Sequence, residues 1–74
     1  MNTEKKAQLN MMLSQLTSLA EWMEDLRGQE AERSAALPKR SPERKSIEEL
    51  CDGLEDAMDS LEDAIRSLEE FVSQ

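Results

Sequence analysis

The chain contains no histidine and only one cysteine, Cys51, in its 74 residues. An internal disulfide needs two cysteines, and histidine is the commonest metal ligand, so neither of the usual supports of a very small domain is expected. A chain of this length makes at most one domain, residues 1–74, and buries too little surface for a secure core of its own. We therefore expect it to gain stability by oligomerising or by docking onto a partner.

Tyrosine is also missing, there is one Trp and one Phe, and only two glycines and two prolines interrupt the chain. This composition disfavours sheet and suits helix. No apolar run is long enough for a signal peptide or a membrane span, and residues 2–6 are polar. Together with the single cysteine, these features predict a cytoplasmic protein without a membrane partner.

Acidic residues predominate, and they are distributed unevenly. The net charge is −8, and residues 47–74 alone hold ten acids and one base. Nucleic-acid phosphates would repel such a chain, which argues against direct nucleic-acid binding. Without histidine or a glycine-rich phosphate loop, no familiar catalytic constellation can be assembled. We expect no enzyme activity, no catalytic or metal-binding residues, no cofactor and no small-molecule substrate.

The first half of the chain has the apolar spacing of a packed helix, 3-4-3-4-3. The residues in this register are Leu9, Met12, Leu16, Leu19, Met23 and Leu26. Leu13 and Ala20 widen the stripe on one side and Trp22 widens it on the other. We expect a helix over about residues 3–36, and whether it breaks at Gly28 is open, because one interior glycine costs a helix only about 1 kcal/mol.

The second half repeats every seven residues through four heptads. Position a is Ile47, Leu54, Leu61 and Leu68, position d is Leu50, Ala57, Ala64 and Phe71, and position e is Cys51, Met58, Ile65 and Val72. An apolar a/d/e face is wider than a two-stranded seam needs and suits a bundle of three or more helices. This pattern predicts a second helix over about residues 42–72.

Two prolines, Pro38 and Pro42, end any helix between the two runs, and Ser41 before Pro42 is a suitable N-cap. A turn over about residues 37–41 makes the helices antiparallel neighbours, so the predicted fold class is all-α, a two-helix hairpin that pairs into a four-helix bundle. If the chain reverses near residues 39–40, the numbers of facing residues sum to about 79. We then expect Trp22 to fill a groove of small residues that includes Gly53 and Ala57.

The predicted apolar interface combines the stripes of both halves. Its residues are Leu9, Met12, Leu13, Leu16, Leu19, Trp22, Met23, Leu26, Ile47, Leu50, Leu54, Met58, Leu61, Ile65, Leu68 and Phe71. Cys51 is read as a small buried hydrophobic residue, although a disulfide between two copies is an alternative. Met11 lies off the stripe. With Leu13 and Trp22 it would leave apolar surface showing on a monomer, which hints at an intermolecular contact.

Carboxylates on the solvent side of the second helix form a candidate acidic binding face. Its residues are Glu48, Asp52, Glu55, Asp56, Asp59, Glu62 and Asp63. The favoured interpretation is that they keep the protein soluble. The alternative is that a rigid row of carboxylates imitates a DNA backbone and occupies the basic groove of a nucleic-acid-binding protein.

Three stretches carry a resemblance to a known group: Ala36-Leu-Pro38, Ser41-Pro-Glu-Arg44, and the tandem heptads from Leu54 to Ile65. They resemble uncharacterised small acidic helical-hairpin proteins of Gram-positive bacteria and their phages or other mobile elements. The resemblance covers roughly the second half, and the basic Lys39-Arg40 departs from the group's more acidic or neutral links. It implies no activity, but it favours a mobile-element accessory role, including inhibition of a host-defence nuclease.

The sequence therefore predicts a non-enzymatic protein–protein interaction module that self-associates as a homodimer or docks on a helical partner. The alternative function is an acidic, nucleic-acid-mimicking inhibitor of a host-defence protein of the anti-CRISPR or anti-restriction type. Association through an apolar face should survive high salt, whereas binding through carboxylates should weaken steeply.

Overall fold

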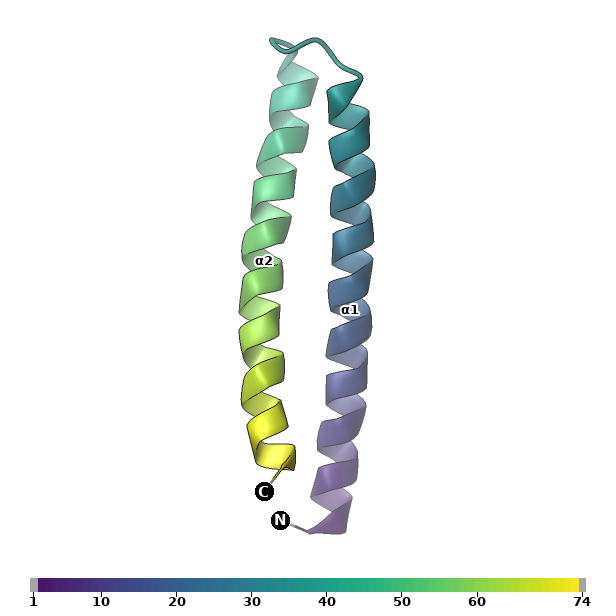
Figure 1. Cartoon of the computed structure of the whole chain (residues 1–74), viewed down its shortest axis with the longest axis vertical. Helices are drawn as coiled ribbons and strands as arrows, with labels where there is room; N and C mark the ends of the chain where they lie inside the picture. The colour runs from purple at the N-terminus through teal and green to yellow at the C-terminus, as the bar shows by residue number, and fades with distance from the viewer. Residues whose placement is uncertain (1, 74) are drawn as a thin grey trace.

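The computed structural model describes residues 2–73 and consists of two antiparallel helices joined by one turn (Figure 1). Helix α1 spans Thr3–Ala35 and helix α2 spans Pro42–Val72. The hairpin is a rod of 56 × 15 × 12 Å. The all-α fold class and the two-helix hairpin are confirmed, and no strand occurs within the described residues.

Both helices begin at a side-chain cap. The Asn2 side chain accepts a hydrogen bond from the Lys5 backbone N–H, with Oδ1 and N 2.8 Å apart. Ser41 caps α2 in the same way, its Oγ 3.4 Å from Arg44 N, and Pro42 takes the first helical position. Each cap satisfies one of the backbone donors that a helix start leaves unpaired. Between the caps, α1 continues through Gly28 without a break.

The turn between the helices is held by its own backbone and by two arginines. Leu37 N–H donates to Ser34 O and Ser41 N–H donates to Pro38 O, each over 3.0 Å. Arg44 of α2 reaches back to the Leu37 carbonyl, with Nη1 and O 3.0 Å apart. Arg33 joins the two helices at this end through an ion pair with Glu43 at 3.1 Å. These contacts fix the direction in which α2 leaves the turn.

The two helices meet along what we term the hairpin seam, whose residues recur at alternating steps of four and three. All of its side chains are buried or half-buried. From α1 it takes Leu9, Leu13, Leu16, Ala20, Met23, Arg27, Glu30 and Ser34, and from α2 it takes Ile47, Cys51, Leu54, Met58, Leu61, Ile65, Leu68 and Val72. Ile47, at 4% exposed, is the only apolar residue of the described chain that is buried rather than half-buried or exposed, so one seam alone gives a thin core.

Two contacts set the register of the helices. Arg27 Nη1 lies 3.3 Å from Glu55 Oε1, and Cys51 Sγ lies 3.8 Å from the Arg27 carbonyl oxygen. The numbers of these facing residues sum to 82 and 78. The register is therefore close to the predicted sum of 79.

The predicted rotation of the helices about their axes is wrong. Trp22, expected to fill the small-residue groove of α2, is 70% exposed, and a Cβ added to Gly53 would meet nothing within 4 Å. In α2 the seam uses positions a and e rather than a and d. Burying Met58 and the other e side chains removes more apolar surface from water than burying the alanines at d, such as Ala57.

The d positions of α2, and the α1 positions that come one residue before a seam residue, therefore lie outside the hairpin seam. Met12, Leu19, Leu50 and Phe71 were all expected in the packed seam, and all four are exposed. Leu13 and Ala20, expected only to widen the stripe, lie in the seam instead. The hairpin seam thus buries one edge of each wide apolar stripe and leaves the other edge exposed to solvent.

Candidate functional site

Within residues 2–73, six large apolar side chains are exposed. Their exposed fractions run from 41% for Leu19 to 70% for Trp22. The six residues are Met11, Met12, Leu19, Trp22, Leu50 and Phe71. Single exposed apolar residues are ordinary on a protein surface, so their arrangement decides whether they form a site.

Most of these side chains share one side of the hairpin, as helical geometry shows. Met12 and Leu19 each come one residue before a seam residue of α1, and Leu50 and Phe71 each come one residue before a seam residue of α2. One residue back turns a side chain about 100° around its helix axis, in the same sense for both helices. Because the helices are antiparallel and face each other, equal rotations carry both stripes to the same side of the hairpin.

We call this surface the uncharged face. It comprises Met12, Gln15, Leu19, Trp22 and Leu26 of α1 and Leu50, Gly53, Ala57, Ser60, Ala64, Ser67 and Phe71 of α2. No charged residue occurs among these twelve positions, although charged residues make up 35% of the chain. On both helices the spacing alternates between three and four, so each helix carries a second packing register beside the one used in the hairpin seam.

Side-chain size is divided between the two halves of the uncharged face. The α1 half carries large side chains such as Leu19 and Trp22. The central positions of the α2 half are all small: Gly53, Ala57, Ser60, Ala64 and Ser67. On α1, Leu19, Trp22, Met23 and Leu26 also line a small hollow of about 140 Å³. The face therefore has a ridge of large side chains with an apolar notch on α1. On α2 it has a row of five small residues, from Gly53 to Ser67, which we term the trough.

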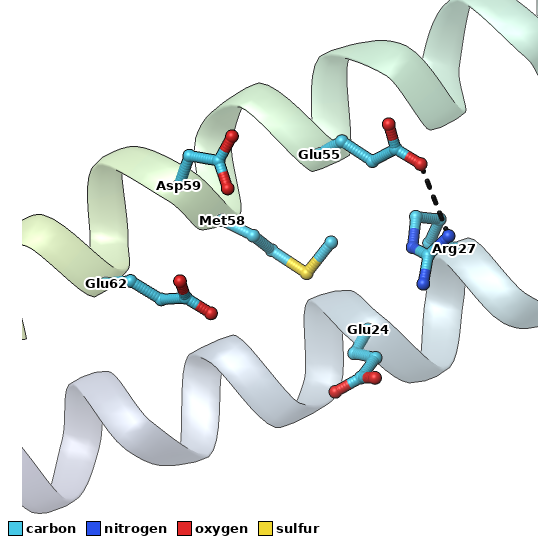
Figure 2. Close-up of a pocket in the computed structure, with 6 residues that line it drawn as sticks. All are labelled: Glu24, Arg27, Glu55, Met58, Asp59 and Glu62. Carbon is cyan, nitrogen blue, oxygen red and sulfur yellow. Dashed lines mark hydrogen bonds and ion pairs between the residues drawn. The ribbon is translucent and has the colours of Figure 1, made fainter.

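Carboxylates gather on the opposite side of the hairpin. A groove of about 340 Å³ lies between the helices, lined by Glu24, Arg27, Glu55, Met58, Asp59 and Glu62. Figure 2 shows these side chains. Arg27, paired with Glu55, is the only cation among these residues. All seven residues of the candidate acidic face are exposed, and the groove adds Glu24, which sequence reasoning missed because it lies on α1.

The predicted apolar interface divides into two parts in the structure. The hairpin seam takes Leu9, Leu13, Leu16, Met23, Ile47, Leu54, Met58, Leu61, Ile65 and Leu68. Met12, Leu19, Trp22, Leu50 and Phe71 are exposed, and half-buried Leu26 joins them at the edge of the uncharged face. Sequence reasoning had treated these sixteen residues as one surface. Cys51 is half-buried in the seam, its thiol turned to the Arg27 carbonyl.

Residues 2–73 hold neither a candidate metal site nor a candidate membrane span. No group of three or more carboxylate or thiol side chains is arranged to hold a metal ion. Neither α1 nor α2 has a stretch apolar enough to cross a lipid bilayer.

The fold and the face together define a small antiparallel helical hairpin with one uncharged side. Comparison of the chain with protein-family models, with curated proteins and with solved structures finds no match. The resemblance to small phage and mobile-element proteins therefore stays a prediction.

Proposed function

We propose that this protein is a non-enzymatic interaction module that binds an apolar surface of another polypeptide through the uncharged face. The observation that carries the proposal is the gathering of exposed large apolar side chains, Trp22 above all, on the uncharged face. Depletion of charge and enrichment in Trp and Met are typical of the centre of a protein interface. Tryptophan is also among the residues whose removal costs most binding energy.

The spacing of the uncharged face suggests what kind of surface it meets. A 3-4 alternation matches the knobs-into-holes packing of a helix, so we expect the partner to present one or more helices. The seam of the hairpin already occupies the other register of each helix. A helix with two adjacent packing registers suits a bundle of more than two helices.

A pair of charge-insertion variants tests the proposal. Ala57→Glu places a carboxylate in the middle of the uncharged face, and Thr17→Glu adds the same charge at an exposed position on the opposite side of the hairpin. Both sites are in mid-helix and exposed, so neither variant should unfold the hairpin. We expect Ala57→Glu to weaken binding to a helical partner or a second copy by at least about tenfold, since burying an unpaired charge is costly. Equal binding by the two variants would refute the proposal.

A second candidate function rests on the acidic groove. Glu24, Glu55, Asp59 and Glu62 approach one another from both helices with Arg27 as the only cation among them, an arrangement that supports a nucleic-acid-mimicking inhibitor of a basic protein. Its test is competition with DNA for a DNA-binding protein. Binding should weaken steeply with salt and with the double substitution Glu55→Gln and Glu62→Gln, while Ala57→Glu should leave it unchanged.

A further inference from the structure

The uncharged face is complementary to itself in side-chain size. We infer that its partner is a second copy of this chain, and that two hairpins pack with these faces together into a four-helix bundle in which α1 of each copy lies on α2 of the other. This inference rests on the proposed function and names the partner of the same face. Three observations carry it: the distribution of side-chain size, the area that the single hairpin exposes, and the placement of charge.

Size complementarity selects the arrangement of the two copies. A twofold axis parallel to the helices puts each α1 on the partner's α2, with both turns at the same end, and leaves every residue at its own height along the rod. Because facing residue numbers sum to 78 and 82 within one hairpin, a sum near 80 also applies between copies. Trp22 then inserts between the partner's Ala57 and the partner's Ser60, and Leu26 between the partner's Gly53 and the partner's Ala57.

The other twofold arrangement fits poorly. An axis perpendicular to the helices would put α1 on α1 and α2 on α2, so that Leu19, near the middle of α1, would face Leu19 of the partner. Large side chains would collide along one side of the interface, and alanine, serine and glycine would leave gaps along the other. Overpacking and cavities both destabilise a packed interface.

The hairpin exposes enough extra area to form a stable dimer interface. The hairpin exposes 5726 Å², whereas a compact monomer of 8.4 kDa would expose about 4,600 Å². The difference is on the order of 1,100 Å², and a standard interface buries about 800 Å² from each partner. Pairing two rods of 56 × 15 × 12 Å side by side also gives the assembly a more compact shape.

The placement of charge allows the two uncharged faces to meet. The acidic groove lies on the side away from the uncharged face, so its carboxylates stay in water in the dimer. Residues 30–50 around the turn contain five acids and five bases. The open end of the hairpin, residues 2–10 and 65–73, contains three of each. Placing both turns at the same end therefore brings no excess of like charge together.

Sedimentation equilibrium of the purified chain tests the second copy. We expect a mass of twice 8.4 kDa, a monomer for Ala57→Glu at the same concentration, and wild-type behaviour for Thr17→Glu. Circular dichroism should show that all three remain helical. Wild-type protein that is monomeric at every attainable concentration overturns the inference. If such a monomer binds another helical protein and only Ala57→Glu abolishes this binding, the proposed function stands with a different partner. If Ala57→Glu and Thr17→Glu bind equally, the inference and the proposed function are both overturned.

Disulfide trapping tests the arrangement. In a Cys51→Ser background, chains carrying Leu19→Cys are mixed with chains carrying Ala64→Cys and oxidised with oxidised glutathione. The inferred bundle brings these two positions together, so the cross-linked dimer should form mainly in the mixture and contain one chain of each kind. Dimers formed by Leu19→Cys alone would show that α1 lies on α1 and would overturn the inferred packing.

Leucine substitutions at the two helical glycines also test the inferred packing, with Gly28→Leu as the control for Gly53→Leu. A Cβ at Gly28 or at Gly53 meets nothing within 4 Å, and both residues are exposed, so we expect the monomer to tolerate leucine at either position. Gly53→Leu blocks the trough and should raise the dimer dissociation constant by roughly tenfold or more, whereas Gly28→Leu, outside the uncharged face, should leave it within about twofold. Equal dissociation constants for the two variants would contradict the inferred packing.

Discussion

Arg27 of α1 and Glu55 of α2 form an ion pair across the hairpin, with Nη1 and Oε1 3.3 Å apart. Both side chains are more than a third exposed, so the pair itself contributes little to stability. Within the described residues, the Arg27 Nε is buried without a hydrogen-bond partner, which opposes folding. A charged residue thus occupies a seam position where an apolar one would fit.

This relationship predicts that Arg27→Leu stabilises the hairpin. Leucine keeps the packing of the arginine stem and removes the unpaired Nε, so the free energy of unfolding should rise by roughly 1 kcal/mol. Urea denaturation monitored by circular dichroism measures it. The control, Glu55→Gln, should change the free energy by less than about 1 kcal/mol. A loss of stability in Arg27→Leu would mean that the ion pair matters more than its exposure indicates.

Substitution by alanine should destabilise the hairpin strongly at Ile47 and only weakly at Leu50, about one helical turn away. Ile47 lies in the hairpin seam and is 4% exposed, so Ile47→Ala should reduce the free energy of unfolding by about 2–4 kcal/mol at any protein concentration. Leu50 lies on the uncharged face, and Leu50→Ala should cost the dilute protein less than about 1 kcal/mol. Denaturation of both variants over a dilution series provides the comparison. Similar losses in dilute protein would place Leu50 in the hairpin seam.

The fold was predictable from local signals that each depend on a few residues. The cap at Ser41, the prolines of the link and the heptad repeat of the second half indicate where helices start, stop and run. The reversal point near residues 39–40 gives the register, because the helix residues on either side of a short turn lie at the same height along the rod. These features depend on sequence order alone.

Which edge of each stripe turns inward was not predictable in the same way. In α1, the register through Met12 and Leu19 and the register through Leu13 and Ala20 share Leu9, Leu16 and Met23, so spacing cannot separate them. The choice depends on how much apolar area each rotation buries against the other helix, which is a tertiary property. For the same reason the uncharged face, made of residues from both helices, and the approach of Glu24 to the acids of α2 emerge only in three dimensions.

Gly28 provides a stabilising substitution without any new contact. It lies inside α1, where a Cβ meets nothing within 4 Å. Gly28→Ala should raise the free energy of unfolding by about 0.5–1 kcal/mol, because alanine loses less backbone freedom on folding. Thermal denaturation followed by circular dichroism at 222 nm, where a helix has strong negative ellipticity, reports the change in the midpoint. An unchanged or lower midpoint would indicate that α1 does not continue through this position.

Salt dependence separates the two surfaces of the hairpin. Each chain has a net charge of −8, so two copies repel one another at long range. Raising ionic strength from 0.1 M to 1 M shortens the Debye length from about 10 Å to about 3 Å, and self-association through the uncharged face should therefore tighten. Sedimentation equilibrium at several NaCl concentrations measures this. A dimer that dissociates as salt rises would have to be held by ion pairs rather than by the uncharged face.

Fluorescence of Trp22, the only tryptophan in the chain, tests the central claim most directly. In the single hairpin its side chain is 70% exposed, and in the face-to-face dimer it is buried against the partner. The emission maximum should shift to shorter wavelength as protein concentration rises, and it should stay at the position of a hydrated indole in Ala57→Glu at every concentration. An emission maximum that is the same in both proteins and independent of concentration would contradict burial of the uncharged face by a second copy.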